Sequence, residues 1–125
     1  MVYNALAGTA VGCTYGLTLE QIKQGIETLQ SVSGRFHIIE TGKYTVVDDC
    51  YNANPVSMKA SLDVLKEAKG RKVAVLGDMG ELGTDGAALH AEVGTHAGTC
   101  GIDALYCAGP LCEHLAKAAK EADSK

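Results

Sequence analysis

The sequence lacks any run of about 20 apolar residues, the length that spans a membrane, and no signal peptide precedes its first predicted helix. It also lacks a basic excess, because 15 Asp and Glu outnumber 11 Lys and Arg and give a net charge of −4. Nucleic-acid-binding domains usually carry a basic stripe. These absences predict a cytoplasmic protein without membrane insertion and without a nucleic-acid partner. The residues present, 46% hydrophobic and 21% charged in 125 positions, are typical of one globular domain.

Paired cysteine spacings are also missing. The chain has no C-x-x-C pair, and its five cysteines are Cys13, Cys50, Cys100, Cys107 and Cys112. Cys112 and His114 lie close enough in the sequence to suggest a metal site, but zinc sites usually have two short spacings. In a reducing compartment an isolated cysteine behaves as a small buried hydrophobe. We therefore predict no metal ligands in this chain.

The beginning of the chain predicts two helices. Residues 2–14 are rich in Ala and Leu, and Thr18 followed by Gln21 then makes a capping box ahead of apolar residues at helical spacing. The pattern breaks at residues 31–34, where we place a domain boundary. Two helices alone cannot bury their apolar faces, so residues 1–33 are predicted to be the end of a neighbouring domain.

After this boundary strands alternate with helices. We expect strands at 36–40, 44–49, 72–77 and 103–108, and helices at 54–70, at 85–100 and from 110 onward. The first two strands read as a hairpin, and the continuous apolar run KVAVLG reads as a buried parallel strand. The order predicts an α/β, Rossmann-like fold, in which flanking helices cover both faces of a mostly parallel sheet. Because the chain stops after a helix, we expect few strands, one poorly covered face and an incomplete domain.

The loop at residues 48–55 (DDCYNANP) leaves the carboxyl end of a predicted strand, where open α/β sheets bind ligands. It leads into a helix N-terminus, whose free N–H groups and dipole favour an anion such as phosphate. A neighbouring carboxylate would accept hydrogen bonds from sugar hydroxyls. Asp and Asn are also common turn residues, and capping alone would explain Asn54.

A second loop, at residues 77–83 (GDMGELG), follows the next strand. Its glycines fall three apart, so it is not the G-x-G-x-x-G dinucleotide motif, and G-x-x-x-x-G-K-[ST] occurs nowhere in the chain. Asp78 and Glu81 would orient a cationic group of a substrate or simply be solvated. Arg35 would bind a phosphate bidentately or form a surface salt bridge.

The remaining candidates are the histidines, at positions that we interpret as strand or helix interior: His37, His90, His96 and His114. A packed or solvated role is the more frequent outcome for each. No spacing indicates a Ser-His-Asp group, and we assign no catalytic residue. Reasoning from the residues alone ends at a nucleotide-binding lobe.

Three segments together resemble the Mur ligase family: Gly34-Arg35-Phe36, the run DDCYNANPVSM at 48–58 and the run VAVLGDMGELG at 73–83. The two longer runs are most similar to the family member that adds D-alanyl-D-alanine. The resemblance covers nearly the whole chain. Residues 1–33 are similar to the last helices of the family's central ATP-binding domain, and residues 34–125 to the larger part of its C-terminal domain.

The resemblance implies an ATP- and Mg²⁺-dependent ligase of peptidoglycan synthesis, cytoplasmic and monomeric in full length. Its substrates are a UDP-N-acetylmuramoyl tripeptide, whose terminal carboxylate ATP phosphorylates, and D-alanyl-D-alanine, whose amine attacks the acyl phosphate. The family places its phosphate loop, modified lysine and metal ligands upstream of these residues. The chain by itself is therefore predicted to be inactive.

The resemblance also implies roles for individual residues. Asp49 matches the acidic residue near the ATP ribose, and Arg35 matches the arginine that approaches the nucleotide when the domains close. The other residues on the nucleotide side are Tyr51, Asn52 and Asn54, and the residues facing the substrate are Asp78, Met79 and Glu81. Cys50 departs from the serine usual in the family, which puts a hydroxyl contact there in doubt.

Two alternatives stay open. One is a sister ligase with another amino substrate, such as an enzyme that adds glutamates to folate, although the YNANP loop argues against it. The other is a stand-alone α/β module that binds nucleotide without catalysis, which nothing in the 125 residues excludes. A nicotinamide-binding domain is a poorer match because the glycine spacing is wrong.

Overall fold

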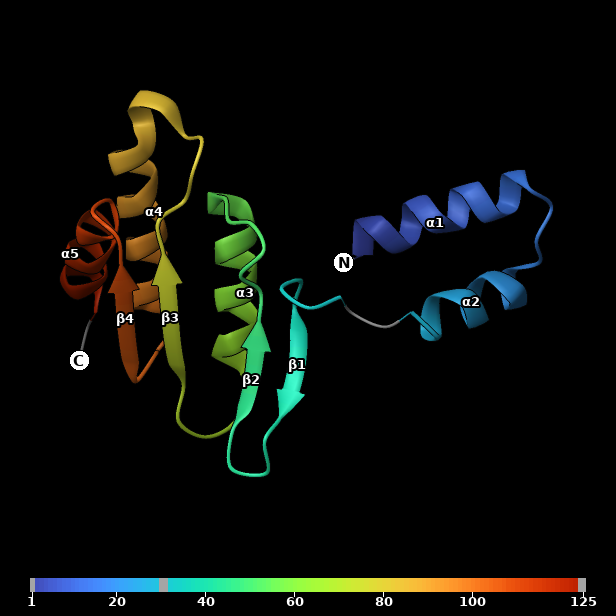
Figure 1. Ribbon diagram of the computed structural model, residues 1–125, viewed down its shortest axis with the longest axis horizontal. Helices are drawn as coiled ribbons and strands as arrows, with labels where there is room; N and C mark the ends of the chain where they lie inside the picture. The colour runs from blue at the N-terminus through green and yellow to red at the C-terminus, as the bar shows by residue number, and fades with distance from the viewer. Residues whose placement is uncertain (1, 30–31, 124–125) are drawn as a thin grey trace. The chain divides into compact units, whose positions relative to one another are not determined.

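A computed structural model describes residues 2–29 and 32–123, and the chain divides into two compact units, Met1–Val32 and Ser33–Lys125 (Figure 1). The predicted break at 31–34 falls at this division, although Ser31 lies outside the described residues. None of the helices in the described ranges is long and apolar enough to cross a membrane.

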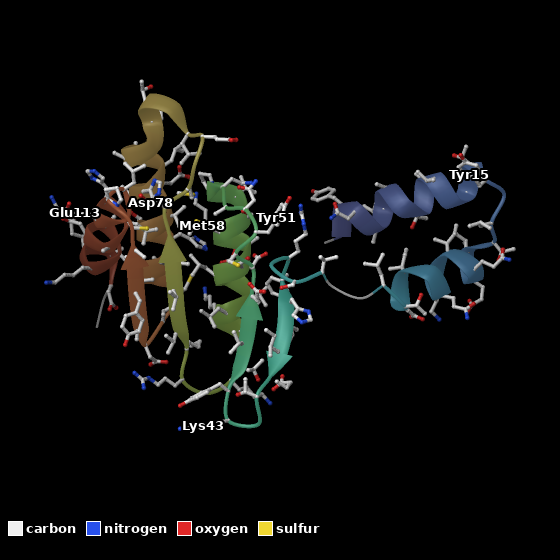
Figure 2. All side chains as sticks on the ribbon, viewed as in Figure 1. Tyr15, Lys43, Tyr51, Met58, Asp78 and Glu113 are labelled. Carbon is white, nitrogen blue, oxygen red and sulfur yellow. The ribbon has the colours of Figure 1, made fainter. Side chains whose placement is uncertain are left out.

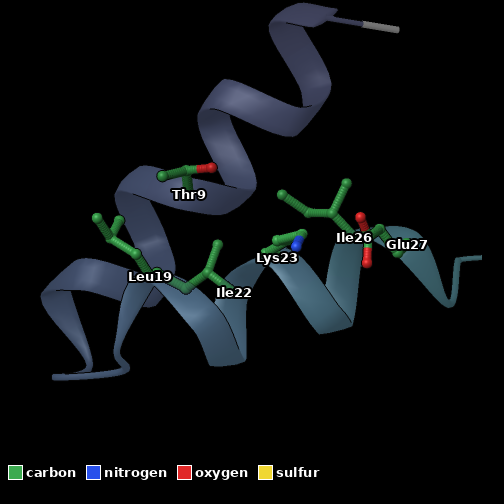
Figure 3. A pocket seen from close by; sticks show the side chains of 6 residues that line it. All are labelled: Thr9, Leu19, Ile22, Lys23, Ile26 and Glu27. Carbon is green, nitrogen blue, oxygen red and sulfur yellow. The ribbon is translucent and has the colours of Figure 1, made fainter.

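The first unit is a pair of helices, α1 (Val2–Thr14) and α2 (Leu19–Glu27). The predicted capping box is present: the Gln21 amide donates to the Thr18 hydroxyl, and the Gln21 side chain accepts from the Thr18 amide. Ile22 is buried against Gly12, where a Cβ atom would come within 2.8 Å of the isoleucine side chain. A shallow groove between the helices is lined by Thr9, Leu19, Ile22, Lys23, Ile26 and Glu27 (Figure 3).

The second unit contains two separate two-stranded sheets. The predicted hairpin is confirmed: β1 (His37–Glu40) pairs antiparallel with β2 (Thr45–Asp48). The other sheet pairs β3 (Val73–Gly77) with β4 (Ala104–Ala108) in parallel. β2, β3 and β4 all point the same way, so their carboxyl ends lie at one edge (Figure 1).

Three helices complete this unit: α3 (Pro55–Glu67), α4 (Gly86–Thr99) and α5 (Cys112–Ala122). α3 begins where predicted, because the Asn54 side chain accepts from the Ser57 amide at 2.9 Å and the Ser57 hydroxyl accepts from the Asn54 amide. A short 3₁₀ turn, Gly83–Asp85, precedes α4. The order of elements and the α/β class are as the sequence predicted.

The hydrophobic core lies between the helices and the β3–β4 sheet. Its buried members are Met58, Leu62, Ala74, Met79, Val93, Ala97, Cys100, Cys112, Leu115 and Ala119. α4 and α5 pack closely, because Gly94 has no Cβ; a Cβ there would lie 2.1 Å from the Leu115 carbonyl oxygen. The core thus combines residues from α3, β3, α4 and α5.

The continuous apolar run at residues 72–77 predicted a strand buried on both faces. That prediction is wrong for one face of β3. Ala74 is buried and Leu76 half-buried, but Val75 is 74% exposed and Tyr106 on neighbouring β4 is 60% exposed. Among the described residues the helices therefore cover one face only. The prediction of helices on both faces of the sheet is wrong, and the expectation of one poorly covered face is confirmed. A continuous apolar run does not show whether one face or both faces of a strand are buried, because Val is favourable on either face.

Candidate functional site

Both loops singled out in the sequence leave the same edge of the second unit. We call this the carboxyl-end edge and define it as residues 48–55, from the last residue of β2 to the first of α3, and residues 77–83, which begin with the last residue of β3. Figure 2 labels Tyr51 in the first loop and Asp78 in the second. Ligands of open α/β sheets bind at this kind of edge.

Asp49 connects three parts of the chain at this edge. Its Oδ1 accepts a hydrogen bond from the Phe36 amide at 2.9 Å, and its Oδ2 accepts one from the Ser61 hydroxyl of α3 at 2.6 Å. A carboxylate offers about four acceptor sites, so these two bonds orient Asp49 and leave lone pairs for a ligand. The partner Ser61 was missed in the sequence, because twelve positions separate it from Asp49.

The segment before β1 is fixed to the first loop through Asp48. Asp48 accepts from the Gly34 amide at 2.8 Å and from the Ser33 hydroxyl at 3.2 Å, while the Tyr51 amide donates to the Gly34 carbonyl at 2.9 Å. Hydrogen bonds from the Cys50 thiol and from the Gly34 amide hold the pKa of Asp48 below its ordinary value. The hydrogen bond to Asp48 in turn raises the pKa of the Cys50 thiol. Asp48 was not among the predicted site residues.

Arg35, which precedes β1, stacks on Tyr51 of the first loop, and both side chains are exposed. The Arg35 guanidinium lies 4.2 Å from the centre of the Tyr51 ring, and Tyr51 is 68% exposed. Among the described residues, Asn52 accepts a hydrogen bond only from the adjacent Ala53 amide, whereas the Asn54 side chain caps α3. A stacked guanidinium and aromatic ring offer a positive charge and a flat apolar face to a ligand.

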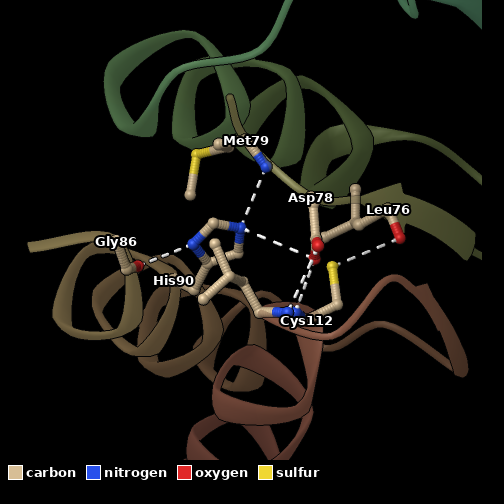
Figure 4. Close-up of polar contacts among 7 residues, drawn as sticks. Leu76, Asp78, Met79, Gly86, His90 and Cys112 are labelled. Carbon is tan, nitrogen blue, oxygen red and sulfur yellow. Dashed lines mark hydrogen bonds and ion pairs between the residues drawn. The ribbon is translucent and has the colours of Figure 1, made fainter. Parts of the chain in front are cut away.

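In the second loop, Asp78 serves as a cap for α5. Its carboxylate accepts from the Cys112 amide at 2.7 Å and from the Leu111 amide at 3.2 Å (Figure 4). Gly109 makes room for it: its φ is +119°, and a Cβ there would lie 2.3 Å from the Asp78 carboxyl carbon. Partial burial acts to raise the pKa of Asp78, but the bonds from Leu111 and Cys112 outweigh it and lower the pKa.

His90 anchors the same loop from inside the core. It is fully buried; its Nε2 accepts from the Met79 amide at 2.9 Å, so its Nδ1 carries the proton and donates to the Gly86 carbonyl at 2.7 Å (Figure 4). Because one nitrogen accepts and the other donates, this geometry holds the neutral imidazole. The expectation that His90 is a packed residue is confirmed.

The three residues predicted to face the substrate have different surroundings. Met79 is 2% exposed and belongs to the core, and Asp78 is half-buried under α5. Glu81 is exposed, with a left-handed backbone φ of 61°. Only Glu81 of the three therefore extends freely into solvent.

Two groups of metal-ligating side chains occur in the part of the chain that the structure describes: Asp63, His96 and Cys100, and Asp78, His90 and Cys112. His114, paired with Cys112 in the sequence, belongs to neither. In the second group both His90 nitrogens are already bonded, and burial together with Asp78 raises the pKa of the Cys112 thiol to about 11. That group is a hydrogen-bond network holding the loop to α4 and α5.

Comparison with known proteins gives one consistent result. Residues 34–125 match the Mur ligase, glutamate ligase domain. The chain is 42% identical over 109 residues to the UDP-N-acetylmuramoyl-tripeptide--D-alanyl-D-alanine ligase of Escherichia coli (strain K12), covering 86% of this chain and 24% of that protein. The Treponema pallidum (strain Nichols) ligase of the same name is 40% identical over 116 residues, or 91% of this chain and 25% of that protein.

Solved structures agree. MurF from Acinetobacter baumannii superposes with a TM-score of 0.88 at 35% identity, over 95% of this chain and 26% of that one. MurF ligase from Thermotoga maritima, solved in complex with ADP, gives 0.73 at 32% identity, over 85% and 24%. This chain spans about a quarter of the length of these relatives. The family resemblance of its two loops is confirmed, and the chain belongs to the Mur ligase family.

Proposed function

We propose that this chain is part of an ATP-dependent ligase that joins D-alanyl-D-alanine to a UDP-N-acetylmuramoyl tripeptide in cytoplasmic peptidoglycan synthesis. The observation that carries the proposal is the 42% identity to the Escherichia coli enzyme named for this reaction. In this proposal residues 1–33 are the last helices of the central ATP-binding domain, and residues 34–125 belong to the C-terminal domain. The full-length enzyme would be a monomer.

The first loop of the carboxyl-end edge is the proposed nucleotide side. The exposed guanidinium of Arg35, stacked on Tyr51, suits a phosphate or a base, and Asp49 keeps lone pairs for ribose hydroxyls. Asn52 would add a polar contact, and Asn54 would hold the α3 N-terminus in place. These residues fit ATP. When bound, ATP would supply the phosphoryl group that activates the tripeptide carboxylate, with Mg²⁺ neutralising phosphate charge.

The second loop is the proposed side for the amino substrate. Glu81 is the exposed carboxylate there, and it would attract the ammonium group of D-alanyl-D-alanine. Asp78 and Met79 would act as positioning residues, because their hydrogen bonds to α5 and to His90 set the path of the loop. In this proposal the exposed Glu81 contacts the substrate, and the more buried Asp78 and Met79 hold the loop in position.

A chimaera tests the proposal. The aligned 109-residue segment of the Escherichia coli relative is replaced by the matching part of this chain. With ATP and Mg²⁺ present throughout, phosphate release is measured with UDP-N-acetylmuramoyl tripeptide and D-alanyl-D-alanine. We expect release only when both are present, and a fall of about tenfold or more in kcat/KM for Arg35→Ala. Release that instead requires a different amino substrate would support the sister-ligase alternative. A folded, inactive chimaera would contradict the proposal.

The 125-residue chain alone is expected to be inactive. It contains no G-x-x-x-x-G-K-[ST] loop to hold the ATP phosphates, and catalysis in closing enzymes needs both sides of the cleft. ATP hydrolysis by the purified chain should therefore equal the buffer rate. Steady turnover that co-elutes with the chain through a second column would overturn this expectation.

A further inference from the structure

The outer edge of the interface between α3 and α4 carries a ladder of polar side chains. On α3, Lys59 and Asp63 are one turn apart. On α4, Glu92 and His96 have the same spacing, and Cys100, the C-cap residue of α4, follows four positions later. Lys59 pairs with Glu92, and His96 Nε2 lies 2.8 Å from Asp63 Oδ1. The last step of the ladder adds a thiol to a carboxylate and an imidazole.

Asp63, His96 and Cys100 place three metal-ligating atoms within 4.8 Å of one another. Thiolate sulfur, imidazole nitrogen and carboxylate oxygen are the three donors that Zn²⁺ uses in proteins, at about 2.0 to 2.3 Å, and tetrahedral geometry then separates the donors by about 3.3 to 3.7 Å. Residues at i and i+4 of one helix, as His96 and Cys100 are, lie on the same face. The third donor comes from the neighbouring helix.

Burial at this group falls steadily from the core outward. Cys100 is 2% exposed, the His96 side chain 30% and the Asp63 side chain 58%. An ion would therefore enter from the exposed Asp63 side and bind next to the buried Cys100 thiol, with a water molecule as its fourth ligand. We propose that Asp63, His96 and Cys100 form a Zn²⁺ site that links α3 to α4.

Zinc binding would displace fewer buried hydrogen bonds at this group than at the other one, although burial raises the pKa of the Cys100 thiol as it raises that of Cys112. Zinc would replace the hydrogen bond between Asp63 and His96, and the Cys100 thiol, now donating to the His96 carbonyl at 3.2 Å, would release its proton to solvent. At His90 an ion would instead leave the buried Met79 amide without its acceptor. The second group therefore serves as an internal comparison.

Cobalt and zinc titrations of the full 125-residue chain test the site. Cys13→Ser and Cys50→Ser are introduced first, because these two thiols are exposed and would bind metal on their own. We expect one Co²⁺ per chain, with thiolate-to-cobalt charge-transfer absorption, displacement by Zn²⁺, and a Tm that rises with Zn²⁺ concentration as binding to the folded state requires.

Single variants then identify the ligands in that background. Cys100→Ser should abolish the charge-transfer band, and His96→Gln and Asp63→Asn should weaken Zn²⁺ binding about tenfold or more. Asp63 is exposed and His96 is half-buried outside the core cluster, so their variants should keep the circular dichroism of the parent. The matched controls are Cys107→Ser, a half-buried thiol outside both groups, and His114→Gln, an exposed histidine outside both; both should bind as the parent does.

The contrary results are equally definite. A charge-transfer band that survives Cys100→Ser, or zinc affinity that His96→Gln and Asp63→Asn leave unchanged, would overturn the site. So would absence of cobalt binding in the folded parent chain. A band lost in Cys107→Ser but kept in Cys100→Ser would place the metal elsewhere and reject the proposal.

Discussion

Asp78 lies at the carboxyl-end edge, as the sequence predicted, but its carboxylate caps a helix of the same unit. It follows β3 in the loop that the sequence selected, yet its two oxygens accept from the amides of the N-cap residue and the first residue of α5, Leu111 and Cys112. A carboxylate at a helix N-terminus satisfies free amides and favours the helix dipole. The residue therefore stabilises the fold whether or not the loop binds a substrate.

The acid dependence of stability should report this role. The folded pKa of Asp78 lies below its ordinary value of 3.8, so the folded state binds fewer protons than the unfolded state near that pH. Its stabilisation is complete above the ordinary pKa and is lost as pH falls through the folded pKa. Asp78→Asn should lower Tm at pH 7, and the difference from the parent should shrink progressively below about pH 5. Parallel Tm curves for the two proteins down to acid pH would contradict the assignment.

The two asparagines of the first loop provide a matched pair. Asn54 caps α3 by accepting a hydrogen bond of 2.9 Å from the Ser57 amide, whereas Asn52 accepts one from the adjacent Ala53 amide. Asn54→Ala should lower the free energy of unfolding by about 1 kcal/mol, and Asn52→Ala should change it by less than about 0.5 kcal/mol. Urea denaturation of the chain measures both. Equal losses would mean that the cap does not hold α3.

At the scale of elements, the core depends on the close packing of α4 against α5. Gly94 and Gly98 let the helix backbones approach, since a Cβ at either would lie within 2.5 Å of a carbonyl oxygen of α5. Periodicity predicted both helices but not this close approach, because a glycine in a helical run looks like a weak helix former. The requirement appears only when the partner helix is in place.

Gly94→Ala should therefore be severe. The added methyl group would overlap the Leu115 carbonyl, and separating the helices to admit it should cost about 3 kcal/mol of unfolding free energy. Thr95→Ala, next in the chain but exposed, is the control and should change stability by less than about 0.5 kcal/mol. Urea denaturation gives both values. A Gly94→Ala protein as stable as the control would mean that the two helices are not packed this closely.

At the scale of the whole molecule, the two units differ in how much they bury. Every member of the core cluster lies between Met58 and Ala119, whereas Ile22 is the one buried apolar side chain described before residue 33. Helices of 13 and 9 residues are marginal in water without a packed partner. The second unit therefore contains the buried core that it needs to fold by itself.

A chain of residues 33–125 should fold alone. We expect it to keep the circular dichroism of α3 to α5 and a cooperative thermal transition, while a peptide of residues 1–32 should show little helix at 25 °C. Far-ultraviolet circular dichroism during heating measures both. Gradual melting of the 33–125 chain would show that its core needs residues outside this range.

What the sequence determined by itself was local or motif-based. The helix N-terminus at Asn54, the capping box at Thr18 and the hairpin follow from bonds between residues a few positions apart, and the two loops carried the family. Only the tertiary structure decided which face of β3 is covered, that Ser61 orients Asp49, that Asp78 caps α5, and that Asp63 lies beside His96. These depend on pairs 12 to 34 positions apart, and sequence periodicity describes what one element prefers, not which element packs against it.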